Sequence, residues 1–360
     1  MTKKCDPNVP YNDLPHLPPE KSLFNDISLW ELEAKARSCI AELKGLANII
    51  PNQSILINAI VLEEAKDSSE IENIITTRDK LYNGIYSDSK KVDKSTEEVI
   101  HYRKALMYGF GLIKTQGFLR KNDIDKIQEI IVGNKAGLRK TPGTALVNDK
   151  TNEIVFTPPE PQILEGLMGN IVDFFNTCES TLINMAILHF QFETIHPYYD
   201  GNGRTGRILN ILYMISKEQL DIPILYLSSY ITANKKDYYR LLNKVTIERE
   251  WSEWIQFVLK GIISVSEDTI QKVKLIKNEI DKILEVVKKE KPKIYSKELV
   301  EALFEHPYCK IEFIVSSIGV ERKAASRYLN QLVDIGVLSK HQIGKEHVFV
   351  NEGLMTILKS

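Results

Sequence analysis

The pattern of apolar and polar positions predicts a mostly helical protein. Residues 182–192 and 208–215 are apolar on nearly every face, which is typical of helices buried in a core. The polar, glycine-rich segment 196–207 lies between them. The pattern therefore predicts a polar loop held between two buried helices, with Gly203 and Arg204 at the start of the second.

The first third of the chain predicts an extended arm followed by helices. Four prolines between residues 10 and 19 favour extended backbone over the first twenty residues. Residues 28–31 match a capping box, so a helix is expected from there to about Ile49. A second helix is expected to start at Asn52 and to cover about residues 55–75. A polar linker over 87–94 and a long helix from Ser95 through Leu112 follow.

Residues 144–157 interrupt the helical pattern. Two short apolar runs, 144–147 and 154–157, flank the turn-prone residues 148–152. This arrangement predicts a β-hairpin.

The last 65 or so residues predict a separate unit. Helices are expected from Tyr295, over 311–318 and over 321–332, followed by a hairpin of residues 337–340 and 347–350 split by Gly344. This order resembles a winged helix-turn-helix with residues 325–327 at the recognition-helix position. Because the unit is only mildly basic, docking to protein is favoured over binding to DNA.

Composition narrows the class of protein. A chain of 360 residues has room for two or three domains, and a net charge of −1 shows no bias towards nucleic acid or membrane surfaces. No secretory leader and no run of about 18 apolar residues are found, so we expect no membrane association. The cysteines are widely separated, which favours reduced thiols in a cytoplasmic protein: Cys5, Cys39, Cys178 and Cys309.

The segment 196–207 carries the chemistry of a site for moving a phosphorus-centred group. His196 can take a proton from a hydroxyl near neutral pH, and Asp200 offers a hard oxygen to Mg²⁺. Gly201 and Gly203 leave room for backbone N–H groups to close around phosphate oxygens.

Two arginines complete this segment. Arg204 and Arg207 are three residues apart, so they share one face of the helix that begins here. An arginine that leads into an apolar helix needs an anionic partner, because an unpaired buried charge is costly. That partner is either a structural carboxylate or a ligand phosphate, and arginine clamps phosphate well.

Residues 196–207, His-Pro-Tyr-Tyr-Asp-Gly-Asn-Gly-Arg-Thr-Gly-Arg, resemble the signature of the Fic (Fido-fold) family, His-Pro-Phe-x-Asp/Glu-Gly-Asn-Gly-Arg-x-x-Arg. Tyr198 departs from the pattern but keeps an aromatic ring. The resemblance implies a protein adenylyltransferase, which transfers AMP from ATP to a Tyr, Thr or Ser hydroxyl. A kinase-like branch of the family has Lys where this chain has Gly203, so the nucleotidyl-transferring branch fits better.

The resemblance also implies a role for each matching residue. His196 would deprotonate the target hydroxyl, and Asp200 would hold Mg²⁺ against the α- and β-phosphates. The backbone at Gly201 and Gly203 would form the anion hole. The remaining implied nucleotide contacts are Asn202 with the loop and α-phosphate, Arg204 with the β-phosphate side, Arg207 with the γ-phosphate, Thr205 and Gly206 within the same stretch, and Tyr239 with adenine.

Some of these residues have simpler interpretations. Tyr239 could be a helix-packing aromatic. His189 is expected to be a core histidine rather than a catalyst, and Trp251 and Trp254 are expected to close the core.

The hairpin of residues 144–157 would be the family's flap, which binds the target backbone, and Thr157-Pro158-Pro159 resembles the usual end of that flap. The alternative is an ordinary surface hairpin.

Residues 68–73, Ser-Ser-Glu-Ile-Glu-Asn, match the family's inhibitory pattern Ser/Thr-x-x-x-Glu-Gly/Asn. Its fixed positions here are Ser68, Glu72 and Asn73. The resemblance implies that Glu72 pairs with Arg207 and blocks seating of the γ-phosphate, which makes this the self-inhibited class. The alternative is an exposed Glu72 in an ordinary acidic helical turn.

These observations predict a mainly α protein with a Fic core, a hairpin flap and a C-terminal winged helix. The expected divisions are an N-terminal region 1–94, a catalytic core 95–264, a linker helix 265–292 and a winged helix 293–360. The expected function is an autoinhibited protein adenylyltransferase that uses ATP and Mg²⁺ on protein substrates, itself included. The alternatives are a DNA-binding regulator with a nucleotide-sensing core, and a Fic enzyme that uses another nucleotide or removes AMP. A homodimer is left open.

Overall fold

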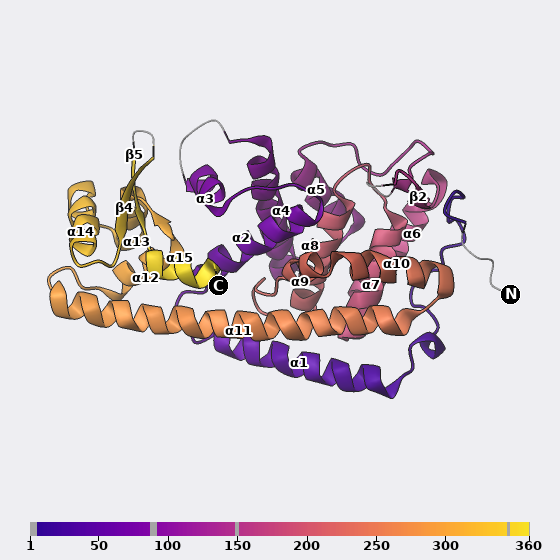
Figure 1. The fold of residues 1–360 in the computed structure, drawn as a ribbon, viewed down its shortest axis with the longest axis horizontal. Helices are drawn as coiled ribbons and strands as arrows, with labels where there is room; N and C mark the ends of the chain where they lie inside the picture. The colour runs from indigo at the N-terminus through magenta and orange to yellow at the C-terminus, as the bar shows by residue number, and fades with distance from the viewer. Residues whose placement is uncertain (1–5, 87–91, 148–150, 344–345, 360) are drawn as a thin grey trace.

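The computed structural model describes residues 6–86, 92–147, 151–343 and 346–359, and most of these are helical (Figure 1). The longest helix, α11 (Trp251–Glu290), runs the length of the molecule from the core to the C-terminal unit. The helix α1 (Ile27–Ala47) packs along it. The division expected between residues 264 and 265 falls inside this continuous helix.

The N-terminal helices correct two details of the sequence analysis. The capping residue of α1 is Asp26, whose side chain accepts a hydrogen bond from the Ser28 N–H at 2.9 Å. The capping box expected at Ser28 is therefore wrong, because Asp26 already satisfies the first turn. Helix α2 (Gln53–Ile71) starts after its cap Asn52, as expected. It ends before residue 75 because Asn73 takes a left-handed conformation with φ of 61°.

Helix α3 (Arg78–Tyr86) was not predicted, and residues 87–91 of the expected linker lie outside the described residues. Asp93 caps the long helix α4 (Lys94–Gln116) by accepting from Thr96 N at 3.0 Å. Two short 3₁₀ segments are also present, Lys21–Leu23 and Pro161–Ile163.

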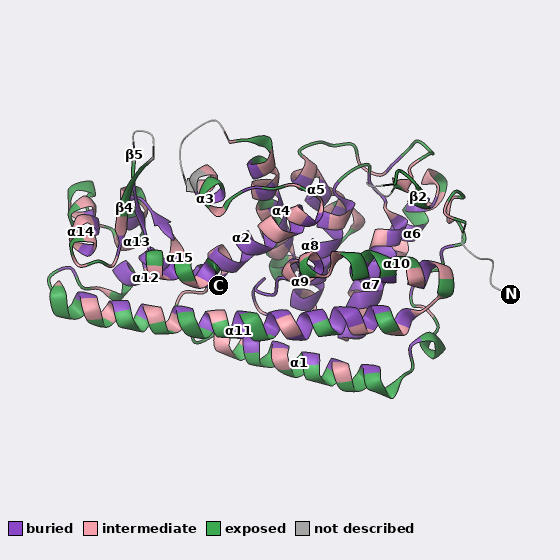
Figure 2. Cartoon of the chain, viewed as in Figure 1, coloured by how far each residue is buried: buried purple, intermediate pink, exposed green. Residues whose placement is uncertain are grey.

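The core is a cluster of helices around α7 (Leu182–Ile195) and α8 (Asn202–Ser216). Both are buried on nearly every face, as their apolar pattern predicts (Figure 2). Trp251 and Trp254 are buried and close the core, and the Trp254 indole N–H donates to the Ala186 carbonyl at 2.8 Å. The other core helices are α5 (Lys121–Val132), α6 (Leu164–Thr177), α9 (Ser228–Ala233) and α10 (Lys235–Glu248).

The predicted hairpin is present but shorter than expected. Strand β1 (Leu146–Val147) pairs antiparallel with β2 (Ile154–Phe156). The expected turn begins in residues 148–150, which lie outside the described residues.

The C-terminal unit contains the helices and hairpin that the sequence predicts. They are α12 (Lys297–Glu305), α13 (Ile311–Ile318), α14 (Arg322–Asp334), β4 (Ser339–Ile343) and β5 (Glu346–Val350). Strand β3 (Tyr308–Cys309) and helix α15 (Glu352–Lys359) were not predicted. The sheet order is β3-β5-β4.

Two expectations drawn from composition, on the cysteines and on membrane-spanning helices, can be compared with the structure. Cys39, Cys178 and Cys309 are free thiols, and Cys5 lies outside the described residues. Within the described ranges, no helix combines the length and apolarity that a bilayer crossing needs.

Candidate functional site

The loop 196–201 joins α7 to α8 through two left-handed residues. His196 caps α7 with φ of 47°, and its N–H donates to the Phe192 carbonyl at 3.1 Å. Gly201 has φ of 79°, and a Cβ there would lie 2.9 Å from a Val132 methyl carbon. Glycine is therefore needed at 201 for conformation and for space.

Asn202 locks this loop with both atoms of its amide. Its Oδ1 accepts from Tyr198 N at 2.8 Å, and its Nδ2 donates to Tyr198 O at 2.8 Å. The Tyr198 hydroxyl donates to Asp125 at 2.7 Å, so the ring is held as well. The backbone N–H groups that open α8 are thereby placed in a fixed arrangement.

Glu72 bridges the two arginines of α8. Its Oε1 lies 2.8 Å from Arg207 Nη2, and its Oε2 lies 3.3 Å from Arg204 Nε. The Arg204 and Arg207 side chains are 1% and 3% exposed, so neither could remain unpaired at low cost. Burial lowers the pKa of Arg207, but Glu72 and other nearby groups raise it above its usual value, so this side chain stays charged. Glu72 is therefore not the solvent-facing carboxylate of the simpler interpretation.

The rest of the 68–73 segment supports this bridge. Ser68 accepts from Arg207 twice, through Oγ at 2.7 Å and through its carbonyl at 2.9 Å. The left-handed Asn73 turns the chain away directly after Glu72. At Gly203 a Cβ would lie 2.6 Å from Glu72 Oε1, so glycine makes room for the carboxylate.

Arg204 has two further carboxylate partners. Its Nη1 lies 3.1 Å from Glu98 Oε2, and its Nη2 lies 3.3 Å from Asp200 Oδ1. The sequence analysis missed Glu98, which lies on α4 about a hundred residues away. Only the packing of α4 against α8 brings the two together.

Asp200 lies at the open side of the loop. Its side chain is 67% exposed, and its Oδ1 accepts from Gly201 N at 2.6 Å. Within the described residues, no group of three or more His, Cys, Asp or Glu side chains could hold a metal by itself. One exposed carboxylate beside a nest of N–H groups fits Mg²⁺, which typically uses one or two carboxylates together with phosphate oxygens.

The surroundings of His196 favour its neutral form. Burial and the nearby Arg139 charge together lower its pKa to about 4. The imidazole is therefore neutral at pH 7. Arg139, which the sequence analysis missed, is buried and donates from Nε to the His196 carbonyl at 2.7 Å and from Nη2 to the Pro159 carbonyl at 2.9 Å.

Other ionisable groups lie behind the loop. Burial raises the pKa of Glu193, which lies one turn before His196, to about 7. A Cβ at Gly206 would lie 2.4 Å from Glu193 Oε1. His189 is a core residue, as expected, with Nε2 at 3.0 Å from the Tyr238 hydroxyl. Tyr239, the residue expected to contact adenine, is 49% exposed and packs edge-on against the Tyr238 ring.

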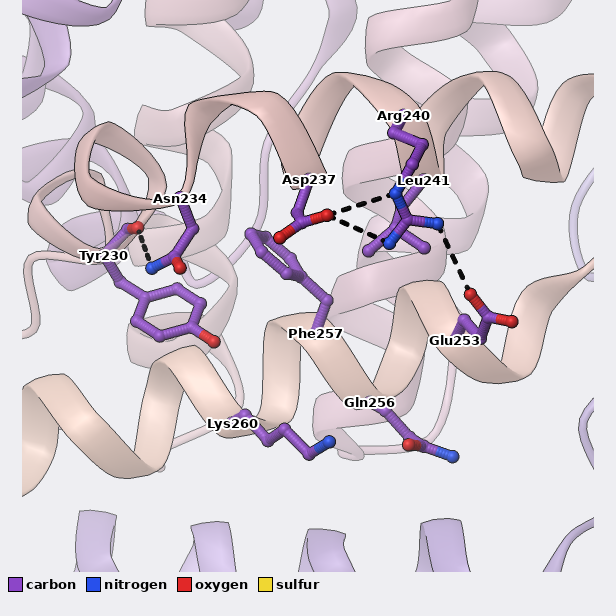
Figure 3. A pocket seen from close by; sticks show the side chains of 9 residues that line it. All are labelled: Tyr230, Asn234, Asp237, Arg240, Leu241, Glu253, Gln256, Phe257 and Lys260. Atoms are coloured by element: carbon purple, nitrogen blue, oxygen red, sulfur yellow. Dashed lines mark hydrogen bonds and ion pairs between the residues drawn. The ribbon is translucent and has the colours of Figure 1, made fainter.

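A surface pocket of about 230 Å³ lies between α9, α10 and α11 (Figure 3). Its polar wall contains Arg240, which lies 3.0 Å from Asp237 and 3.6 Å from Glu253. None of its lining residues belongs to segments 68–73 or 196–207, and Tyr239 does not line it. It is therefore not the predicted nucleotide site.

Sequence profiles identify the family. The Fic/DOC family profile matches residues 95–214, and the Fic/DOC family N-terminal profile matches residues 30–111. Together they cover slightly more than half of the chain. This chain belongs to the Fic/DOC family. A third profile, described as the C-terminal domain of SoFic-like protein adenylyltransferase, matches residues 280–354.

Curated relatives match parts of this Fic protein. The probable protein adenylyltransferase aq_aa38 of Aquifex aeolicus is 34% identical over 80 residues, which are 22% of this chain and 25% of that protein. Protein adenylyltransferase fic-1 of Caenorhabditis elegans is 42% identical over 65 residues, 17% of this chain and 13% of that protein. Protein adenylyltransferase Fic of Aedes aegypti is 27% identical over 148 residues, 39% and 29% of the two chains. The matches thus span less than a third of each relative.

Solved structures share the fold over a longer stretch. A Fic family protein from Desulfovibrio desulfuricans G20 has a TM-score of 0.57 at 17% identity, covering 90% of this chain and 96% of that one. Fic-1 (residues 134–508) from C. elegans has a TM-score of 0.53 at 21% identity, covering 68% and 72%. These neighbours confirm the expected Fic fold.

Proposed function

We propose that this Fic protein transfers AMP from ATP to Tyr, Thr or Ser hydroxyls of proteins, itself included, and that Glu72 holds it inactive. The observation that carries the proposal is that the Glu72 carboxylate lies between two buried arginines, Arg204 and Arg207, and acts electrostatically on the pKa of His196. An anion already occupies the position where a nucleotide phosphate would lie. Relatives named protein adenylyltransferases support the reaction class.

The transfer follows from the chemistry of His196. The neutral imidazole takes the proton from the target hydroxyl as its oxygen attacks the α-phosphorus. The bond from the α-phosphorus to the oxygen that bridges to the β-phosphate breaks, and pyrophosphate leaves. The loop N–H groups at Gly203 and, once Asp200 releases it, at Gly201 would stabilise the charge on the α-phosphate oxygens together with the positive end of α8.

The remaining nucleotide contacts follow from the same helix. Arg204 and Arg207 would hold the β- and γ-phosphates once Glu72 withdraws, and Thr205 and Gly206 lie in the turn between them. Tyr239 would contact adenine. Asp200 would hold Mg²⁺, which when bound neutralises phosphate charge.

Ser68 and Asn73 place the inhibitory Glu72. Ser68 fixes Arg207 in the orientation that meets the carboxylate, and Asn73 ends α2 at that point. As long as the bridge lasts, the γ-phosphate has no guanidinium to bind. The wild-type enzyme should therefore be slow until the bridge opens.

The target protein would dock on the hairpin. Val147 and Ile154 pair across the two strands and are 49% and 38% exposed, and Val155, on the opposite face of β2, is 43% exposed. Adding a strand at the edge of such a hairpin is a common way to bind an extended peptide.

Intact mass spectrometry after incubation with ATP and Mg²⁺ tests the proposal. The Glu72→Gly variant should gain the mass of one or more AMP units, and His196→Ala should gain none. Binding of operator DNA without any mass change would support a DNA-binding regulator instead. Arg322 on α14 already pairs with Glu312, which reduces the charge available for DNA.

A further inference from the structure

The N-terminal arm, residues 6–17, lies against the end of the hairpin (Figure 1). Tyr11 N donates to the Thr157 carbonyl at 3.1 Å, and the Thr157 hydroxyl donates to the Pro7 carbonyl at 2.6 Å. The Tyr11 ring also packs edge-on against Phe156 of β2, with centroids 6.1 Å apart. The arm therefore contacts the hairpin through backbone and side chain.

A reciprocal side-chain pair extends this contact. Asn12 Nδ2 donates to Glu160 Oε2 at 3.0 Å, and Glu160 N donates to Asn12 Oδ1 at 2.9 Å. Residues 157–160, the hairpin exit, are thus held at both ends by the arm.

The hairpin needs such support. β1 has two residues and β2 has three, with a register irregularity between them. An isolated two-stranded hairpin is marginally stable at best, even with longer strands. Its position must therefore come from contacts outside the hairpin.

The other end of the arm is anchored in the core. Leu14 and Leu17 are buried. Leu17 N donates to Oδ1 of the Asn170 side chain on α6 at 2.7 Å, and Asn170 Nδ2 donates to the Leu17 carbonyl at 3.0 Å. Gln191 donates from α7 to the Pro15 carbonyl at 2.7 Å. Because α7 also carries His196, the arm connects the hairpin to the helix that presents the catalytic base.

We propose that the arm is a positioning element for the protein substrate. It sets the hairpin at a fixed place relative to His196, so that a segment docked on the hairpin presents its hydroxyl to the imidazole. Arg139 provides the second connection, from the Pro159 carbonyl to the His196 carbonyl. This inference rests on the proposed function, because it concerns the binding of the substrate of that reaction.

Hydrogen exchange of the full-length protein tests the physical part of the proposal. The double variant Tyr11→Ala/Asn12→Ala should speed exchange of amides 151–157 by about ten-fold, because each lost hydrogen bond contributes roughly 0.5–1.5 kcal/mol. Asn8→Ala is the matched control, since among the described residues the Asn8 side chain bonds within the arm, to Asp6 at 3.2 Å. Exchange at the wild-type rate in the double variant would overturn the proposal.

Kinetics test the functional part. In the Glu72→Gly background, with a His196→Ala copy of the chain as protein substrate, the double variant should raise KM for that copy by about ten-fold, in line with the same lost contacts. KM for ATP should stay within a factor of two of the parent, which a general loss of structure would not allow. Equal KM values for the protein substrate would overturn the proposal.

Exchanging the amide and the carboxylate between Asn12 and Glu160 provides a rescue experiment. Asn12→Asp alone sets two carboxylates together and should raise KM for the protein substrate, and adding Glu160→Gln should restore it by supplying a donor. Failure of that rescue counts against the Asn12–Glu160 contact as the positioning element. If the Glu72→Gly parent modifies nothing, the proposed function fails, while the exchange experiment still decides whether the arm braces the hairpin.

Discussion

Replacing Glu72 by glycine tests the inhibitory bridge directly. The protein should still fold, because each arginine keeps other partners. Arg204 retains Glu98 and Asp200, and Arg207 retains both acceptors of Ser68. Glu72 is itself 25% exposed, so the stability cost should be about 1–3 kcal/mol, below the value for a fully buried pair.

The gain in activity can be worked from the contact that is lost. A hydrogen bond between charged groups contributes about 1.5–3 kcal/mol, and ATP must displace the 2.8 Å contact between Glu72 and Arg207 before its γ-phosphate can bind. At about 1.4 kcal/mol for each factor of ten, Glu72→Gly should modify itself roughly 10- to 100-fold faster than wild type.

Time courses of intact mass with saturating ATP and Mg²⁺ provide the measurement. Adding Arg207→Ala to Glu72→Gly should abolish the gain, and this non-additivity would show direct coupling of the two residues. Glu70→Gly is the matched control on the same turn of α2, because Glu70 pairs with Lys66 at 3.1 Å and contacts neither arginine. Equal rates for wild type and folded Glu72→Gly, or an equal gain from Glu70→Gly, would refute the reasoning.

Four other predictions follow from the site. His196→Ala should lower transfer by roughly 10²–10⁴-fold with little change in ATP affinity, measured by calorimetry. In the Glu72→Gly background, the acid limb of kcat/KM should lie at or below about pH 4, because burial lowers the pKa of His196 to about 4 and the variant removes the Glu72 charge that raises it; a limb near pH 6.5 would contradict that environment. Asp200→Ala should remove the Mg²⁺ dependence of ATP binding, and an unchanged Mg²⁺ response would assign the carboxylate a structural role. Glu193 has a pKa raised by burial from 4.5 to about 7, so its contribution to stability is present below pH 4.5 and is lost as pH rises to 7. The Tm of Glu193→Gln relative to wild type should therefore rise over that range, and a pH-independent difference would show that Glu193 is ionised in the folded protein.

The sequence predicted the features that depend on neighbours along the chain. The two buried helices followed from unbroken apolar runs, and the hairpin followed from two short apolar runs around turn residues. The boundaries were less accurate, because a cap such as Asp26 or a left-handed residue such as Asn73 decides them through single hydrogen bonds or backbone angles.

The features of the candidate site likewise divide into those that the local sequence determines and those that depend on tertiary packing. The order of His196, Asp200, Gly201, Arg204 and Arg207 along the chain determined that a polar, glycine-rich loop enters a buried helix, since all of these residues lie within one loop and turn. The need for an anion near the arginines also followed from the sequence, because buried guanidinium groups require one, but the sequence left open whether it is a carboxylate or a ligand phosphate.

Only the tertiary structure decided which carboxylates meet those arginines and which groups shift the pKa of His196. Glu72 was expected from a short pattern, whereas Glu98 reaches Arg204 only through the packing of α4 on α8. Arg139 and deep burial, neither of which has a local sequence signal, lower the pKa of His196. Charges interact through space, and burial depends on the whole fold, so these properties arise only when distant segments pack together.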